Sequence, residues 1–476
     1  MCKLIKSLLL SWLFGLLYYS SMFGCCSLLN DDLRNAAFAD PDFSHSFVLR
    51  SNNVSDSFRE ILTGRNQMPF HVRVHAKVLS GVNAGFFFEA VGAIQVSAEP
   101  ENHPFGGLVF AYDRRRVRIW APSLFEETGS NGQIIVVGKD WGGQSYSQTC
   151  EKALVVVHIW YTGPSPTFQA NTIVNTADPK HVFVKINHNL KQIPERVMVR
   201  VTPYSTSDST PNHGFWFNGI TASQNSKKEG YGGVIFAYDS KSILLWVPSS
   251  NTKGTGCIFV GNKWGGGRYA ENTQKCMVHI FAWVLKFPVP SFKTEWYAMI
   301  SQGRNPYETF LEVNHNLNKL PLLVVVQGQI GTNGLIFEGT GTVMSSENNT
   351  GGYGGILFAY DENYVRVWLP KRYKEDTRGY GILVKEGWGD GHMLQAVHKV
   401  SIRVILYSSI CDQKMHMITD NGKCKAIPYN SFQWVIGPWS KCSSICDKGV
   451  NHREILGKNM NIHSPPSINV VVTPLM

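Results

Sequence analysis

One block of nine residues occurs three times in this chain and constrains its fold more than any other feature. The block begins with an aromatic residue and two glycines and ends in Phe-Ala-Tyr-Asp. Its copies are Phe105–Asp113, Tyr231–Asp239 and Tyr353–Asp361. A tryptophan follows the tyrosine of each copy at the same interval, at Trp120, Trp246 and Trp368. A repeat of this long period indicates that one folding unit has been copied three times.

Two further blocks follow each copy in the same order. The first is a tryptophan followed by glycine, at Trp141, Trp264 and Trp388. The second is a short apolar segment, Val157–Ile159, Val278–Ile280 and Val400–Ile402, which predicts that His158, His279 and Ser401 are equivalent. The three blocks together predict modules at residues 42–162, 163–285 and 286–408.

Each module has the pattern of β-strands. Apolar and polar side chains alternate, as at Val72, Arg73 and Val74, which is the period of a half-buried strand. Asp113, Asp239 and Asp361 open the turn after their strands, where an aspartate caps its own backbone well. No segment has the period of a convincing amphipathic helix. We therefore predict an all-β chain of three tandem antiparallel β-sandwich modules of the jelly-roll type.

The N-terminus has the order of a secretory signal peptide. Lys3 and Lys6 precede an apolar run from Leu8 to Leu17, and small residues follow up to Cys26. This order predicts a signal peptide at residues 1–26, a linker at 27–41 and a secreted, extracellular protein. An uncleaved signal anchor is the alternative, but the apolar run is short for a membrane span. After cleavage we expect no stable membrane span.

The formal net charge of +10 favours acidic partners. The densest basic run is Arg114, Arg115 and Arg116. For an extracellular protein these partners are glycans, sulfated ones among them, or matrix proteins rather than nucleic acid. A generally basic surface without a specific partner explains the charge equally well.

The cysteines and sequons fit an oxidising compartment. Cys257 and Cys276 lie on adjacent predicted strands and are predicted to form a disulfide, and Cys411 and Cys424 are two further disulfide candidates. Asn53 and Asn348 stand in sequons for N-glycosylation.

The recurring tryptophans suggest a binding hypothesis. The faces of Trp141, Trp264 and Trp388, each next to glycine, would suit stacking on sugar rings. The commoner use of such a tryptophan is to plug one end of a sandwich. The repeated aspartate could ligate Ca²⁺, but no second carboxylate keeps a fixed spacing from it, which favours turn capping.

No motif of a hydrolase, a metalloprotease, a phosphate-binding loop or a dinucleotide fold is present. His158 and His279 have apolar neighbours and are expected to pack as strand residues. We therefore expect no catalytic residue, no metal and no cofactor.

The segment after the third module differs in composition. Trp434 to Gly449 contains the run Gly-Pro-Trp-Ser-Lys-Cys followed by a second cysteine at 446, and it resembles the start of a thrombospondin type-1 repeat. The resemblance covers part of residues 409–456 and implies adhesion or glycan binding. It also implies a cation–π ladder from Trp434, Trp439 and Arg453, with C-mannosylation on Trp439. Only Cys442 and Cys446 of the family's six cysteines are present, and residues 457–476 are expected to be a disordered tail.

The layout of the three modules is similar to that of H-type lectins. A Pro-x-x-Val-x-Val strand comes first and a Gly-aromatic strand follows it, although no binding residue carries over. These observations predict a secreted adhesion or recognition protein that binds glycans or extracellular matrix through repeated weak sites. The alternatives are a structural matrix protein with protein partners only and a protease-associated protein.

Overall fold

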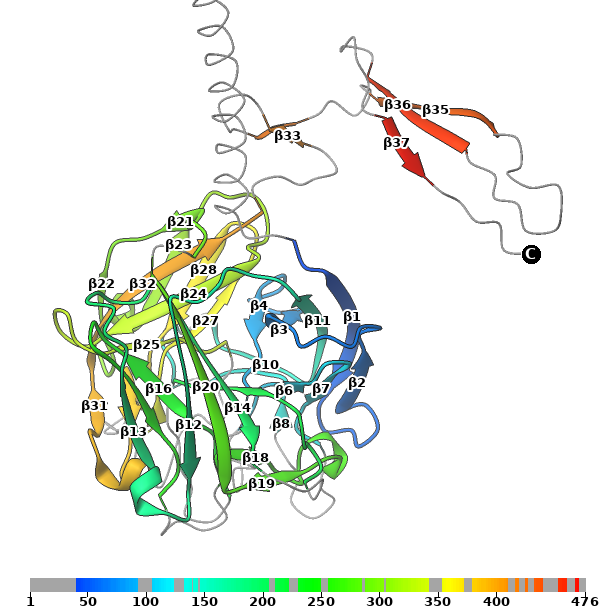
Figure 1. Ribbon diagram of the computed structural model, residues 1–476. Helices are drawn as coiled ribbons and strands as arrows, with labels where there is room; N and C mark the ends of the chain where they lie inside the picture. Colours follow the sequence, from blue (N-terminus) through cyan, green and yellow to red (C-terminus); the bar gives the residue numbers. More distant parts are fainter. Residues whose placement is uncertain are drawn as a thin grey trace, which may run out of the picture. The chain divides into compact units, whose positions relative to one another are not determined.

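The structure is a computed structural model that divides into two units, Met1–Ser408 and Ser409–Met476. It describes residues 40–92, 105–123, 132–138, 140–143, 146–204, 210–221, 230–249, 256–284, 287–303, 305–341, 353–371 and 379–409, and, for the backbone alone, 416–418, 424–426, 432–439, 453–459 and 467–470. In these residues the one α-helix is α2 (Pro306–Thr309), and nearly every other element is a strand (Figure 1). The prediction of an all-β fold is confirmed.

The first repeat consists of two main sheets whose strands follow the predicted alternation. A four-stranded sheet has the order β1 (Phe43–Arg50), β11 (Lys152–Trp160), β3 (His71–Val78), β4 (Phe87–Glu89). A three-stranded sheet has the order β2 (Phe58–Leu62), β7 (Arg116–Trp120), β6 (Val109–Tyr112). Two short ladders join β9 (Ile135–Val137) to β10 (Gln148–Cys150) and β5 (Phe105–Gly106) to β8 (Gly132–Gln133).

The second and third repeats have the same two sheets. In repeat 2 the four-stranded sheet has the order β12 (Phe168–Asn175), β20 (Lys275–Trp283), β14 (Arg196–Pro203), β15 (Phe217–Asn218). Its three-stranded sheet has the order β13 (Phe183–Asn187), β17 (Ser242–Trp246), β16 (Ile235–Tyr238). In repeat 3 the two short strands β21 (Phe292–Lys293) and β22 (Tyr297–Ile300) both pair with β32 (Lys399–Tyr407), and β24 (Leu323–Gln329) and β25 (Ile336–Glu338) follow in that sheet. The three-stranded sheet has the order β23 (Phe310–Asn314), β28 (Tyr364–Trp368), β27 (Leu357–Tyr360). The corresponding ladders are β18 (Ile258–Val260) with β19 (Glu271–Thr273), β30 (Ile382–Val384) with β31 (Gln395–Val397), and β26 (Tyr353–Gly354) with β29 (Gly379–Tyr380).

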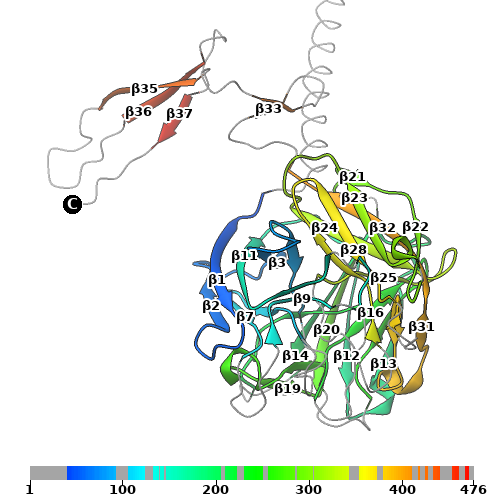
Figure 2. The same ribbon diagram turned by 180° about the vertical axis from the view of Figure 1, so that it is seen from behind.

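The three repeats are joined edge to edge and close on themselves. The three-stranded sheet of repeat 2 continues into the four-stranded sheet of repeat 3, and that of repeat 3 continues into the four-stranded sheet of repeat 1 (Figures 1 and 2). A single bridge joins the three-stranded sheet of repeat 1 to the four-stranded sheet of repeat 2. The joining pairs are Tyr112 with Trp216, Tyr238 with Ile336, and Tyr360 with Phe87. We call the three junctions seam 1–2, seam 2–3 and seam 3–1. The largest hydrophobic cluster accordingly contains buried residues from all three repeats, such as Trp120, Tyr238 and Val326.

The expectation of separate tandem sandwiches therefore needs correction. A sandwich with its own edges would not pair its strands with those of another repeat. Here one seven-stranded sheet contains strands of repeats 1 and 3, and one eight-stranded sheet contains strands of repeats 2 and 3. Pairing between repeats covers the sheet edges that face a neighbouring repeat.

The predicted equivalence of His158, His279 and Ser401 is wrong, because the three residues lie at different positions along their strands. The strands β11, β20 and β32 are each nine residues long and begin at Lys152, Lys275 and Lys399. Counting from these lysines, the residues that share the place of His158 are Phe281 and Ile405. The short Val-x-Ile match was misleading because valine and isoleucine recur along a buried strand at every second residue.

The repeated aspartates cap their turns as predicted. Asp113 Oδ1 accepts hydrogen bonds from the backbone N–H groups of Arg115 and Arg116 at 2.7 and 2.6 Å. Asp239 and Asp361 make the equivalent pairs of bonds at 2.7 Å. Each aspartate thereby fixes the hairpin that carries the seam tyrosine.

The Trp-Gly blocks close the seams. Trp264 pairs with Pro122, Trp388 with Pro248, and Trp141 with Pro370, each time across a seam. The glycine after each tryptophan donates its backbone N–H across the same seam at 2.9 Å, to the carbonyl of Ala121, Val247 or Leu369. The three seams thus share one set of backbone contacts.

Glycine is required in this loop at Gly389. Its φ is +63°, and a Cβ there would lie 2.6 Å from Cδ1 of Trp246 across seam 2–3. Gly391 is a matched control, because its φ is +80° but a Cβ would meet nothing within 4 Å. We expect Gly389→Ala to lower the free energy of unfolding by about 2–4 kcal/mol and Gly391→Ala by about 1 kcal/mol. Urea denaturation of both variants checks this, and equal losses would mean that the tryptophan contact is unimportant.

Candidate functional site

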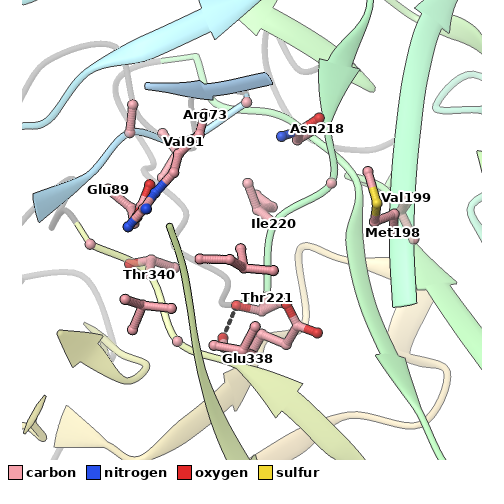
Figure 3. Close-up of a pocket in the computed structure, with 18 of the residues that line it drawn as sticks. Arg73, Glu89, Val91, Met198, Val199, Asn218, Ile220, Thr221, Glu338 and Thr340 are labelled. Carbon is pink, nitrogen blue, oxygen red and sulfur yellow. Dashed lines mark hydrogen bonds and ion pairs between the residues drawn. The ribbon is translucent and has the colours of Figure 1, made fainter. Parts of the chain in front are cut away.

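The three four-stranded sheets meet around a cavity on the axis that relates the repeats. The cavity has a volume of about 140 Å³. Its wall contains one segment from each repeat, directly after the Gly-aromatic strand: Ala90–Gly92, Gly219–Thr221 and Gly339–Gly341. Figure 3 shows Arg73 and Glu89 on one side of it, Asn218 on another and Thr221 beside Glu338. The cavity is therefore a place where residues from all three repeats converge.

A buried ion pair occupies the cavity wall at seam 3–1. Arg73 contacts Glu89 at 2.5 Å, and its guanidinium also donates to the Tyr360 hydroxyl from repeat 3. That hydroxyl lies 3.0 Å from Glu89 Oε1 and bonds to His75 Nδ1. Burial acts to lower the pKa of Arg73, but Glu89 raises it above the ordinary value, so the guanidinium stays charged.

A second buried ion pair occupies seam 2–3. Arg196 of repeat 2 contacts Glu338 of repeat 3 at 2.6 Å. Burial raises the pKa of Glu338, and Arg196 opposes that shift. Tyr238 accepts a hydrogen bond from Gln327 at 2.8 Å and lies 3.3 Å from Glu338. This seam therefore has the same kinds of groups as seam 3–1, supplied from different positions.

The histidines near the axis are held neutral. Burial lowers the pKa of His71 and of His75 well below the usual value, and nearby arginines, Arg73 among them, lower both further. The pKa of His158 falls to about 4, mainly through burial and then through Arg73. A buried neutral imidazole beside paired charges is a hydrogen-bonding group of the core rather than a general base.

The buried charges of the axial cavity are thus paired, whereas Nε2 of His71 in its wall has no hydrogen-bond partner among the described residues. The cavity's two carboxylates, Glu89 and Glu338, each have an arginine. Among the described residues no group of three or more His, Cys, Asp or Glu side chains could hold a metal ion. This arrangement stabilises the junction of the repeats.

The outer face of two seams presents a different cluster. At seam 1–2 the Arg118 guanidinium lies 4.0 Å from the ring centroid of Phe215 and 3.5 Å from that of Tyr269. It donates to Glu60 at 2.7 Å and to Asn212 at 2.8 Å. The Tyr269 side chain is 39% exposed, so this cluster reaches the surface.

Seam 3–1 repeats this cluster with Arg366. Its guanidinium lies 4.0 Å from the ring of Phe86 and 4.1 Å from that of Tyr146. It donates to Glu312 at 2.7 Å and to Asn83 at 2.8 Å. We call these two sites the arginine clusters.

Seam 2–3 has no arginine cluster. Leu244 pairs across from Lys185 where the other repeats have arginine and glutamate. Leu335 follows Gly334 at the position of the phenylalanine ring, and Met393 stands in the loop after Trp388 at the position of the tyrosine ring. The arginine, the glutamate and both rings are thus all replaced together at this seam.

The tryptophan platform is corrected by the structure. Trp141, Trp264 and Trp388 are 3%, 0% and 0% exposed, and they lie in the seams described above. A side chain without an accessible face cannot stack on a sugar ring. The alternative reading, a tryptophan that plugs an end, is nearer the observed packing, except that each one seals the junction with another repeat.

The remaining candidates lie apart from the axis. Arg114 and Arg115 are exposed at a hairpin tip, and Arg116 forms an ion pair with Asp113 at 2.7 Å. The predicted disulfide between Cys257 and Cys276 is formed. Asn53 accepts hydrogen bonds from Ser55 and Asp56 within its turn. The side chains of Asn348, Cys411, Cys424 and Trp439 lie outside the described residues.

The sequence did not single out the axial charges. A charged residue in an apolar strand, such as Arg73 or Arg200, was a usable signal, because burial demands a partner. The glutamate directly after the Gly-aromatic strand, Glu89 in repeat 1 and Glu338 in repeat 3, was a second signal.

Comparisons with known proteins identify no relative: no family model, no curated protein and no solved structure matches this chain. None of the helices in the described part of the chain has the length and hydrophobicity that crossing a bilayer requires.

The Tyr360 hydroxyl is predicted to matter more than that of its counterpart Tyr112. Tyr360→Phe leaves Arg73, His75 and Glu89 short of one partner, which costs about 1–3 kcal/mol in the free energy of unfolding. The Tyr112 hydroxyl makes no hydrogen bond within the described residues, so Tyr112→Phe should be close to neutral. Urea denaturation of the two variants tests the difference, and comparable stabilities would contradict the role of the junction.

The neutral histidines predict a loss of stability in acid. When folding lowers the pKa of a histidine, the unfolded chain takes up the proton at a higher pH than the folded protein does. The contribution of that histidine to the free energy of unfolding is therefore complete above about pH 6.5 and is lost as the pH falls. His75→Gln, which places the residue of repeat 3 at this position, should remove up to about 1.4 kcal/mol per pH unit of this slope in the range just below about pH 6.5. Free energies of unfolding measured across that range check this, and an unaltered slope would contradict it.

Proposed function

We propose that this chain is a secreted recognition protein that binds glycans or extracellular matrix, and that its binding surface is formed by the seams between repeats. The observation that carries the proposal is the arginine cluster, which occurs at seam 1–2 and again at seam 3–1. Each cluster combines aromatic rings, a guanidinium, an amide and a carboxylate. The tyrosine rings of the clusters, Tyr146 and Tyr269, are not buried and offer apolar surface to sugar C–H groups, and the planar polar groups suit sugar hydroxyls.

The exposure of the clusters supports this use. Glu60 and Glu312 have side chains that are 28% and 32% exposed, so their free lone pairs face the surface. Arg118 and Arg366 are 4% and 11% exposed, which holds them in one orientation. A preorganised polar group loses little conformational entropy when a ligand binds.

The closed ring supports multivalent binding. Two like sites on one rigid unit raise the apparent affinity for a ligand with repeated sugars through effective concentration, even where each site is weak. The exposed Arg114 and Arg115 would add a salt-dependent attraction to sulfated glycans.

The second unit supports an extracellular role through its resemblance to a thrombospondin type-1 repeat. Its backbone forms a three-stranded sheet of β35 (Phe432–Trp439), β36 (Arg453–Asn459) and β37 (Ser467–Val470), and a two-stranded one of β33 (His416–Ile418) and β34 (Cys424–Ala426). Trp439 stands opposite Arg453 in the strand register. The family resemblance implies adhesion, which agrees with the proposal for the repeats.

The test replaces the two cluster tyrosines with the residue that repeat 3 itself uses. The double variant Tyr146→Met and Tyr269→Met should lose at least about tenfold in apparent affinity on a glycan array, equivalent to about 1.4 kcal/mol, while its melting temperature stays near that of the parent. The control is Arg114→Ala with Arg115→Ala, which should weaken only the binding that falls with added salt.

Two outcomes would contradict the proposal. Undiminished glycan binding by the tyrosine double variant would exclude the arginine clusters as the site. A silent array together with salt-insensitive capture of matrix proteins would favour the alternative, a structural matrix protein with protein partners only.

A further inference from the structure

A second pocket opens beside seam 1–2, away from the arginine clusters. Its volume is about 340 Å³. Four aromatic side chains line it, two from repeat 1 and two from repeat 2: Phe70, Tyr161, Phe281 and Trp283. The loop from Thr162 to Pro166, which connects the two repeats, forms another wall, and the Trp283 indole donates to the Pro164 carbonyl at 2.9 Å.

One buried cation lines this aromatic pocket. Arg200 is 8% exposed and lies 5.2 Å from the ring centroid of Phe281. It donates through one terminal nitrogen to the carbonyl of Pro69 at 3.3 Å and through the other to that of Phe70. Its Nε–H and the Tyr161 hydroxyl, both buried, have no hydrogen-bond partner in the described part of the chain.

Within the described residues, Arg200 differs from the two arginines of the axial ion pairs because no carboxylate pairs with it. Arg73 has Glu89 and Arg196 has Glu338. The residue of repeat 2 that corresponds to these two glutamates is Asn218, which is the cross-strand partner of Arg200. Burying a guanidinium without an opposite charge is costly, so this site has an unmet demand for an anion.

The surrounding field has the sign that an anion requires. The nearby His71 is kept neutral by burial and by the positive charges of Arg196, Arg200 and Arg73. Among the residues that line the pocket, Arg200 is the one charged group. A single negative charge would therefore balance the site, and the aromatic walls would contact the rest of the ligand.

The geometry points to a binding site for a small organic anion, a monocarboxylate on a ring with an apolar face. The carboxylate would pair with the Arg200 guanidinium, and the ring would lie against Phe70 and Phe281, the partly exposed rings of the pocket. A charge-assisted bond to a buried arginine is among the stronger polar contacts in proteins. This pocket is separate from the surface proposed for glycans or matrix and does not rest on that proposal.

Among the described residues, the other two seams differ from this pocket at its key positions. Glu195 and Leu322 follow their prolines where Phe70 follows Pro69. Glutamate would repel a carboxylate, and leucine offers no ring. The residues that share the place of Arg200 are His75 and Gln327, as their pairing with Glu89 and Glu338 shows.

The test is calorimetric titration of the full secreted chain with two pairs of probes. Benzoate is compared with benzamide, and glucuronate with glucose, so that each pair differs in charge and the two pairs differ in ring chemistry. We expect at least one carboxylate to bind, and its neutral counterpart to bind at least about tenfold more weakly. Equal binding within both pairs, or no binding of any probe, would overturn the proposal.

Two substitutions taken from the other repeats locate the site. Arg200→Gln copies Gln327 and should abolish carboxylate binding. Asn218→Glu supplies the missing internal counter-charge, so it should abolish binding and also raise the melting temperature. The control Arg118→Leu copies Leu244 at the arginine cluster and should leave carboxylate binding unchanged.

The two substitutions keep the test decisive if one of them fails to fold. Carboxylate binding that survives Arg200→Gln or Asn218→Glu in a folded protein would overturn the assignment. Loss of glycan binding in the tyrosine double variant, with carboxylate binding retained, would show that the two sites are separate.

Discussion

The tryptophan loop of each repeat is the contact on which the rest of the structure depends. It places one large buried ring and one backbone hydrogen bond across the junction with the preceding repeat, and the tyrosine hairpin adds strand pairing to the same junction. Because the third junction joins repeat 3 back to repeat 1, the strand edges at all three seams are paired. The unit up to Ser408 is therefore one folding unit with three similar parts, and not three domains on a string.

Closing the ring places equivalent positions of the three repeats around one axis. Because the repeats belong to a single chain, these positions can carry different residues. Three identical chains would place three copies of each side chain around the cavity, which would gather like charges. Here the position of Arg73 is occupied by Met198 and Val325 in the other repeats, and the position of Glu89 by Asn218 and Glu338. Each buried charge can then be matched individually, as at seams 3–1 and 2–3. Seam 1–2 lacks the internal carboxylate, and the anion pocket that we propose lies beside it.

The seams share their backbone contacts but differ in their side chains. The backbone contacts of the tryptophan loop recur at all three seams because any loss would open the ring. The arginine cluster recurs at only two, since Leu244, Leu335 and Met393 replace its parts at seam 2–3 without disturbing those backbone contacts. Side chains that can be exchanged together while the scaffold persists are those expected to serve recognition.

The sequence by itself determined the strands, the threefold repeat, the aspartate-capped hairpins and the Cys257–Cys276 disulfide, because these depend on alternation, turn chemistry and local spacing. It did not determine that Trp141, Trp264 and Trp388 are buried, since a tryptophan beside glycine suits an exposed platform and a sealed seam equally. It also misaligned the last strand of each repeat, where apolar residues recur at every second position. The tertiary structure decided the closure of the ring, the pairing of Arg73 with Glu89 and the isolation of Arg200. Those features depend on which strands and side chains meet in the folded chain, and such meetings leave no local pattern in the sequence.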